Sequence, residues 1–249
     1  MWMGLLGFLQ GPFDPLKLLL AIYGLASFLA TAFAVNNYFD VGSDALNKNK
    51  ENPFLKGCGK DTLILVVANQ ILALAILTFT SPSPALLAYL LTVVLGVAYS
   101  APPFRLKRVA GLDVISHMLY FGILLFLFGA FLAGSPPTHR IAPYAATIGL
   151  YSAFLQLRNL EKDKEYDSRA GDTTLSVMYP GASKALLFLT GILSVVGSLL
   201  LVDPGNLIPV VFIPVSGAIG FWYSWERAVD FQVVASLSLL GLGHLCGYF

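Results

Sequence analysis

Four aspartates occur as two pairs with the same spacing, and each pair follows a long apolar run. Asp40 and Asp44 follow the run that begins near residue 15, and Asp163 and Asp167 follow the run that begins near residue 141. Residues four apart lie on one face of a helix, where two like charges repel. Mg²⁺ removes that repulsion, because it takes carboxylate oxygens and completes its coordination with water and substrate phosphate. The two pairs therefore predict a Mg²⁺ site.

The elements that carry these pairs are predicted from composition. Of the 249 residues, 57% are hydrophobic and 12% are charged, against roughly 45–50% and 25% in soluble domains. The apolar residues form runs of about 17–24, the length of a transmembrane helix and unlike the shorter alternating strands of a membrane barrel. We therefore expect an all-α, polytopic membrane helical bundle, built as a single domain over residues 1–249, and no nucleic-acid partner.

The apolar runs are separated by proline, glycine and charged residues. A fragment at 1–10 is too short to span a membrane, and full spans are predicted near 15–39, 61–80, 84–100, 112–134, 141–159, 182–202, 206–224 and 231–249. With the fragment as a partial first span, the prediction is nine transmembrane helices. The long polar links, at 40–60, 101–111 and 160–181, then fall on one side of the membrane.

Basic residues are distributed unevenly over this topology. Only Lys17 and Arg140 fall on the side of the short turns, and the other thirteen Lys and Arg residues fall on the side of the long links. Basic loops remain in the cytoplasm. The sequence therefore predicts a plasma-membrane protein whose two aspartate pairs lie at the cytoplasmic ends of their helices.

A third segment lies between the two aspartate pairs. Residues 99–108 read Tyr-Ser-Ala-Pro-Pro-Phe-Arg-Leu-Lys-Arg, Asn36 precedes the first pair by four residues, and Ala-Gly and Thr-Leu follow the second pair. In type, order and position on the loops, these segments resemble the UbiA superfamily of intramembrane prenyltransferases. The resemblance covers essentially the whole chain, and its nine-helix fold agrees with the predicted spans.

The resemblance implies a reaction. A prenyl diphosphate is held through two Mg²⁺ ions, with Mn²⁺ as a substitute, its carbon–oxygen bond ionises, and the allylic carbocation alkylates a hydrophobic acceptor in the bilayer. Metal ions and basic side chains neutralise the charge that develops on the leaving diphosphate. An apolar bundle keeps water from the cation.

The resemblance also assigns roles residue by residue. It implies metal binding by Asn36, Asp40, Asp44, Asp163 and Asp167, a catalytic role for the four aspartates and Tyr99, and diphosphate binding by Asn36, Lys48, Arg105 and Lys107.

The sequence departs from the family pattern at two places. Asn37 stands where the family usually has aspartate, and we expect it to support the site without binding metal. Glu-Asn-Pro at 51–53 replaces a basic residue before proline, so Lys48 or Lys50 must bind the diphosphate instead.

Each of these residues also has a structural interpretation. An isolated aspartate pair is a solvated helix end, Arg105 and Lys107 satisfy the positive-inside rule, and Tyr99 fits an interfacial belt. Asp113 is expected to be a helix N-cap, and His117 is expected to be packed. Gly96, Gly122 and Gly129 are expected to let helices approach closely.

Two questions remain open from the sequence. The acceptor is a lipid, a carotenoid or an aromatic quinone precursor, with the loop around Pro102 and Asp113 favouring the first two. The alternative function is a cation transporter with a carboxylate-lined site. A transporter predicts ionisable residues near the membrane midplane, and the predicted spans have nearly none in their middle thirds.

Overall fold

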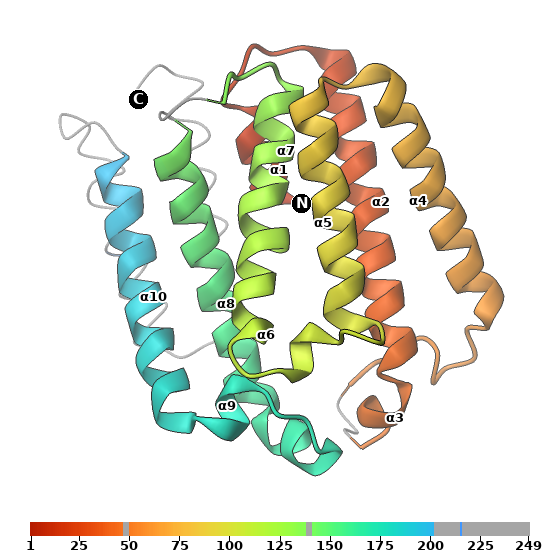
Figure 1. Cartoon of the computed structure of the whole chain (residues 1–249), viewed down its shortest axis with the longest axis vertical. Helices are drawn as coiled ribbons and strands as arrows, with labels where there is room; N and C mark the ends of the chain where they lie inside the picture. The colour runs from red at the N-terminus through yellow and green to blue at the C-terminus, as the bar shows by residue number, and fades with distance from the viewer. Residues whose placement is uncertain (47–49, 138–140, 202–214, 216–249) are drawn as a thin grey trace.

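Long apolar helices run side by side through the part of the chain that the computed structural model describes, which is residues 1–46, 50–137, 141–201 and Val215 (Figure 1). The long elements are α2 (Pro15–Phe39), α4 (Lys60–Thr80), α5 (Ser83–Ser100), α8 (Ala142–Ala170), α10 (Pro180–Leu200) and the continuous unit of α6 (Leu112–His117), η2 (Met118–Leu124) and α7 (Leu125–Leu132). The short elements are α1 (Trp2–Phe8), α3 (Val41–Asp44), η1 (Leu106–Arg108) and α9 (Leu175–Met178). Within the described residues there is one isolated bridge, between Val109 and Thr173, and otherwise the regular structure is helical.

Five described elements are long and apolar enough to cross a membrane: α2, α4, α5, the α6–α7 unit and α10. Their bounds agree with the predicted spans to within about two residues, which confirms the all-α membrane fold. The fragment at 1–10 forms α1. The spans predicted at 206–224 and 231–249 lie outside the described residues.

Helix α8 differs from its prediction in two respects. It continues to Ala170, well past the expected end at residue 159, so most of the first half of the predicted polar link 160–181 is helical. Hydropathy detects where a helix leaves the membrane, whereas the helix itself ends only at Gly171, whose φ of +74° suits a glycine C-cap. The membrane part of α8 is also less apolar than the five spans, because it buries polar side chains such as Ser152 and Gln156 against its neighbours.

Polar side chains join α4 to the bundle in the middle of the apolar region. Gln70 on α4 donates to the hydroxyl of Tyr89 on α5 at 3.0 Å, and Tyr89 donates to the Gly24 carbonyl on α2 at 2.8 Å. The Thr31 hydroxyl donates to the other end of the Gln70 amide at 3.3 Å. Such hydrogen bonds hold membrane helices together where lipid removes the hydrophobic drive for their association.

Glycines allow the closest helix contacts. A Cβ on Gly129 of α7 would lie 1.9 Å from the Gly4 carbonyl oxygen of α1, and one on Gly96 would lie 2.7 Å from the Phe28 ring. A Cβ on Gly122 would lie 2.8 Å from that of Ser152. The expectation for Gly96, Gly122 and Gly129 is therefore confirmed.

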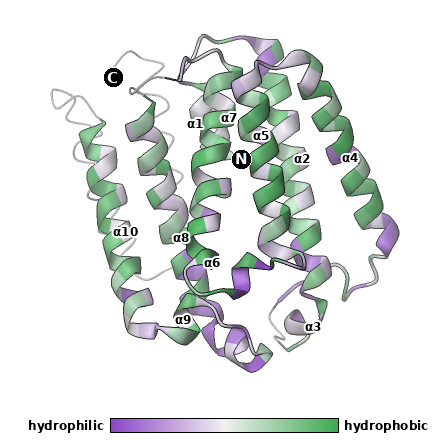
Figure 2. Ribbon diagram, viewed as in Figure 1, coloured by the Kyte–Doolittle hydropathy of each residue, from purple (hydrophilic) through white to green (hydrophobic). Residues whose placement is uncertain are grey.

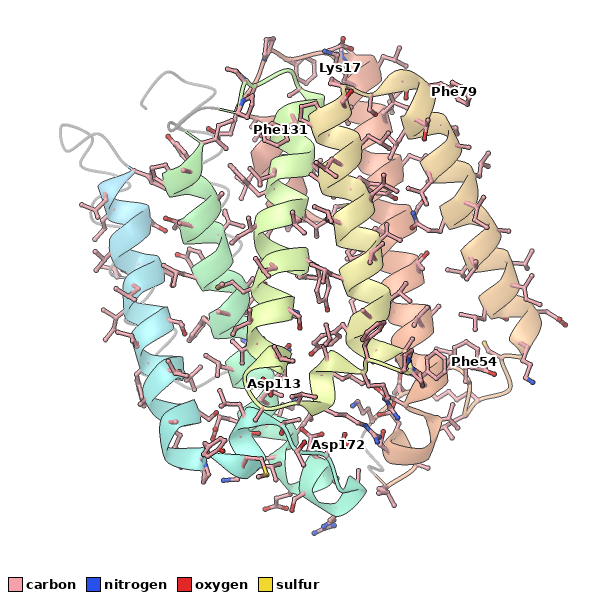
Figure 3. The ribbon with its side chains drawn as sticks, viewed as in Figure 1. Lys17, Phe54, Phe79, Asp113, Phe131 and Asp172 are labelled. Carbon is pink, nitrogen blue, oxygen red and sulfur yellow. The ribbon has the colours of Figure 1, made fainter. Side chains whose placement is uncertain are left out.

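Hydrophilic residues gather at one end of the bundle, around α3, η1, α9 and the last turns of α8 (Figure 2). Asp113 and Asp172 lie at this end, and Lys17 lies at the opposite end (Figure 3). The bundle therefore has one strongly polar end, which is the end where the distribution of charge in the sequence predicts the long polar links.

Candidate active site

A cavity of about 370 Å³ opens at the polar end, between helices from both halves of the chain. One wall carries Asn36, Asp40 and Asp44, and the facing wall on α8 carries Asn159, Asp163 and Asp167. The structure therefore brings the two predicted aspartate pairs to one site.

The first pair lies at the junction of α2 and α3. Asp40 is the C-cap of α2, with φ −99° and ψ 2°, and α3 begins at Val41. The prediction that these residues share one continuous helix is therefore slightly wrong. The four-residue repeat nevertheless survives, because the Asp40 amide bonds to the Asn36 carbonyl at 3.0 Å and the Asp44 amide to the Asp40 carbonyl at 2.8 Å. Asp40 and Asp44 are both buried.

Two basic residues from the loop after α5 neutralise Asp40. Arg105 Nη2 lies 3.1 Å from one carboxylate oxygen, and Lys107 Nζ contacts the other. Lys107 Nζ also donates to Asn36 Oδ1 at 2.9 Å, and Ser100 donates to the same oxygen at 3.0 Å. Burial lowers the pKa of Lys107, against the opposing effect of Asp40. Both predicted diphosphate ligands of this loop thus lie at the first motif.

Lys50 lies between the two motifs. Its Nζ is 3.0 Å from Asp44 Oδ1 and 3.9 Å from Asp163 Oδ2. Burial lowers the pKa of Lys50, but its bond to Asp44 and the carboxylate charges outweigh burial and raise that pKa overall. The predicted ligand Lys48 lies outside the described residues. Lys50, which the sequence offered only as the alternative to Lys48, therefore has the central position.

Asn52 orients the first motif from the link after α3. Its Nδ2 donates to Asp44 Oδ2 at 2.8 Å and to the Asn37 backbone carbonyl at 2.7 Å. Its Oδ1 accepts from the Phe54 amide at 2.9 Å, so the amide is fixed and fully used. The departure at 51–53 thus supplies a buried amide, which the sequence analysis missed. Asn37 does not line the cavity.

The second pair lies on the part of α8 beyond the predicted span 141–159. Burial raises the pKa of Asp167 to about 6, with further contributions from the charges of Asp163 and Asp172. Thr174 donates weakly to Asp167 at 3.4 Å. Asp172 pairs with Arg108 at 2.7 Å, and burial raises the pKa of its carboxyl despite that partner. Burial and two neighbouring carboxylates therefore both favour the protonated form of Asp167.

Asp113 is buried, but it is not the N-cap of its own helix. Gly111 precedes α6, and the Asp113 carboxylate accepts from the Val114 amide at 2.8 Å and the Leu175 amide at 2.7 Å. Leu175 is the first residue of α9. The expectation that Asp113 caps its own helix was wrong. Its carboxylate instead accepts from the first residue of α9, which is distant in sequence.

The donor set at this end fits Mg²⁺. Four carboxylates and the amides of Asn36 and Asn159 offer hard oxygen atoms, and two walls leave room for phosphate. Among the described residues, no three His, Cys, Asp or Glu side chains form a preassembled metal cluster. Instead, Asp44 forms an ion pair with Lys50, and Asp40 forms ion pairs with Arg105 and Lys107.

The deeper wall of the cavity is aromatic. The Tyr99 hydroxyl accepts a hydrogen bond from Gln156 at 2.7 Å, and its ring centroid lies 5.3 Å from that of Tyr120 and 6.0 Å from that of His117. All four side chains line the cavity. Tyr99 therefore faces the site rather than forming part of an interfacial belt.

The two walls repeat each other along the sequence. Six cavity residues of the first wall each have a counterpart 123 positions later that also lines the cavity; the pairs are Ala32 and Leu155, Phe33 and Gln156, Asn36 and Asn159, Asp40 and Asp163, Ser43 and Tyr166, and Asp44 and Asp167. The analysis of the sequence missed Asn159. Its position four residues before Asp163, like that of Asn36 before Asp40, was a signal that could have identified it.

Known proteins resemble the chain over nearly its full length. The model of the UbiA prenyltransferase family matches residues 1–235. A lycopene elongase/hydratase of Haloarcula japonica is 28% identical over 239 residues, which are 92% of this chain and 80% of that protein. A lycopene elongase/hydratase of Haloferax volcanii is 30% identical over 144 residues, which cover 57% of this chain and 48% of that protein.

Two solved structures share the fold. A UbiA homologue from Archaeoglobus fulgidus, bound to DMAPP and Mg²⁺, superposes with a TM-score of 0.73 at 20% identity, over 98% of this chain and 96% of that one. The apo UbiA homologue from Aeropyrum pernix K1 gives a TM-score of 0.73 at 17% identity, over 100% and 98% of the two chains.

Proposed function

The chain belongs to the UbiA prenyltransferase family, and we propose that it transfers a prenyl group from a prenyl diphosphate to an apolar isoprenoid acceptor within the membrane, with Mg²⁺ as cofactor. A cation transporter, the alternative from the sequence, does not agree with membership of an enzyme family.

The main support is the convergence of both aspartate pairs with Lys50 and Lys107 on one cavity with an apolar depth. Asp40, Asp44, Asp163 and Asp167 surround its polar end, and Tyr99 lies deeper. A prenyl diphosphate has the same division, with a highly charged head and a hydrocarbon tail. The head fits among the carboxylates and cations, and the tail fits against the aromatic wall.

The chain's own residues have distinct parts in this proposal. The four aspartates, with Asn36, hold Mg²⁺, which would neutralise charge on the diphosphate as the carbon–oxygen bond breaks. Lys50, Arg105 and Lys107 lie beside the same carboxylates and bind the phosphate oxygens directly. Tyr99 offers an aromatic face to the allylic cation. The buried wall keeps water from the cation.

Two further parts of the proposal concern the side of the membrane on which the active site opens and the chemical class of the acceptor. The positive-inside distribution supports an active site that opens to the cytoplasm from the plasma membrane. The resemblance to lycopene elongase/hydratases supports a polyene acceptor, whose terminal double bond would attack the cation. The deeper wall carries Gly96, Tyr120 and Phe121, an apolar surface that suits a hydrocarbon acceptor.

The proposal is tested with the purified protein in lipid nanodiscs. It is incubated with radiolabelled dimethylallyl diphosphate, Mg²⁺ and either a polyene hydrocarbon or an aromatic acid, and both diphosphate release and the mass of the lipid product are measured. We expect a prenylated polyene. Product with the aromatic acid alone would overturn the choice of acceptor. No diphosphate release under any condition, from protein whose thermal unfolding is cooperative, would overturn the proposed function.

A further inference from the structure

His117 lies in the cavity wall, away from the aspartates. It precedes the π-helical segment Met118–Leu124 and stacks on Phe121, with 4.9 Å between ring centroids. Its ring also lies 5.5 Å from that of Tyr120 and 6.0 Å from that of Tyr99. It is the only histidine among the described cavity residues. The imidazole therefore adjoins the space beside Tyr99 and is packed on the other side.

The protonation of this imidazole follows from its partner. The Ser152 hydroxyl lies 3.1 Å from the His117 backbone carbonyl and 3.0 Å from His117 Nδ1. A carbonyl only accepts, so the single hydroxyl proton goes to the carbonyl and the hydroxyl oxygen accepts from Nδ1–H. Both contacts are satisfied together only in this arrangement. The lone pair is then on Nε2, so this nitrogen is the atom of the ring that can accept a proton.

The fold is built to make this contact. A Cβ on Gly122 would lie 2.8 Å from the Ser152 Cβ, and one on Gly149 would lie 2.8 Å from the Ile123 side chain. Glycine at both positions lets α8 approach η2 closely enough for Ser152 to reach back to His117. The π-helical turns also begin at this point, and such turns are rare outside functional sites.

The proposed reaction needs a proton acceptor at this place. The carbon–oxygen bond of the prenyl diphosphate breaks and its electron pair leaves with the diphosphate. The double bond of the acceptor then bonds to the allylic carbon, which leaves a cation on the acceptor. That cation becomes a stable product when it loses a proton to a base, either from an adjacent carbon or from a water that has added to it.

We propose that Nε2 of His117 accepts this proton, with Ser152 as the residue that positions the imidazole. The inference rests on the proposed function and extends it to the last step. The described carboxylates that line the cavity are paired with Lys50, Arg105, Lys107 or Arg108, or lie in the proposed metal site. His117 is a neutral base on the apolar wall, where the cation on the acceptor forms.

The test compares two quantities in one assay, the product formed and the diphosphate released. His117→Gln keeps an amide N–H for Ser152 but has no basic nitrogen, so we expect product per diphosphate to fall about a hundredfold. The cation left on the acceptor then breaks its new carbon–carbon bond, and water captures the released allylic cation as prenyl alcohol, with the proton passing to the diphosphate. His117→Gly should lose product similarly and regain it with added imidazole in proportion to imidazole concentration. Gln156→Gly makes a comparable hole on the same wall, and imidazole should not rescue it.

The outcomes separate the two proposals. If the unmodified protein releases no diphosphate, the proposed function fails. If it forms product, and folded His117→Gln gives the same product per diphosphate, the inference is refuted while the proposed function stands. Should His117→Gln fail to fold, the imidazole titration of His117→Gly decides, and a flat titration refutes the inference. Ser152→Ala should lose less product than His117→Gln, because it leaves the base in place.

Discussion

Asp44 and Asp163, which lie in opposite halves of the chain, share one ammonium group. Lys50 Nζ is 3.0 Å from the first carboxylate and 3.9 Å from the second. A positive charge therefore joins the two motifs at the point where the proposed function requires metal ions and diphosphate. The side chain that balances the carboxylates in the free protein is placed to bind phosphate oxygens in the loaded one.

Lys50→Gln should weaken binding of the prenyl diphosphate. Hydrogen bonds to charged groups contribute about 1.5–3 kcal/mol, so we expect KM to rise about tenfold or more. The measurement is the dependence of diphosphate release on substrate concentration. Lys56→Gln is the matched control, because among the described residues Lys56 pairs with the exposed Glu51 alone, at 2.9 Å. Equal KM values for the two variants would contradict the role of Lys50.

Asp40→Ala and Asp163→Ala should each reduce turnover about a hundredfold, because each removes a group that stabilises charge in the transition state. Asp61→Ala, on the exposed first turn of α4, should leave turnover unchanged. Turnover is measured across a Mg²⁺ titration, with Mn²⁺ in parallel. Full activity in excess chelator would show that the aspartates do not act through a metal.

Asn52 makes the supporting hydrogen bond to an aspartate of the first motif that the sequence led us to expect from Asn37. Asn37→Asp should leave turnover within about threefold, since an amide and a carboxylate are nearly isosteric and residue 37 does not line the cavity. Asn52→Ala should raise the Mg²⁺ concentration for half-maximal activity about tenfold, because it frees Asp44 from a fixed donor at 2.8 Å. A tenfold fall in the Mg²⁺ requirement of Asn37→Asp would instead indicate that residue 37 binds metal.

Gln70→Leu should destabilise the bundle. The substitution removes the bond to Tyr89 and the bond from Thr31, and hydrogen bonds between membrane helices contribute about 0.6–2 kcal/mol each. The midpoint of thermal unfolding in detergent is the measurement. Thr78→Ala is the control, because the hydroxyl of the exposed Thr78 donates to the Leu74 carbonyl of its own helix and, in the described part of the chain, to no other helix. An unchanged midpoint for Gln70→Leu would mean that α4 is held by packing alone.

Hydropathy was sufficient to predict where the five described membrane spans lie, because the burial of apolar side chains in lipid is a property of each segment alone. It could not predict that α8 continues to Ala170, since charged residues form helices in water as readily as apolar residues do in lipid. The aspartates of the site were found because each pair has the same four-residue spacing. A spacing of this kind can be read directly from the sequence, without knowledge of the fold.

Several of the residues that were not predicted, or were assigned wrongly, have partners outside their own helix or link. Asn52 reaches Asp44 from the next link, and Asp113 reaches the amide of Leu175. Their partners depend on how the loops fold over the end of the bundle, which no local spacing records. Lys50 is a related case, because two lysines in one basic run are equivalent until the backbone is placed.

The last prediction concerns orientation and uses a cysteine that the chain already has. Cys58 is exposed on the link between α3 and α4, at the end of the bundle that holds the site. In cells that express Cys246→Ser, an impermeant thiol reagent should label Cys58 only after the membrane is opened, because thirteen of the fifteen basic residues are predicted on this side. The control is Ser83→Cys in a variant without both native cysteines. Ser83 begins α5 at the opposite end and is exposed, so it should react in sealed cells. Labelling of Cys58 from outside, with Ser83→Cys protected, would place the aspartates on the outer face and refute a cytoplasmic active site.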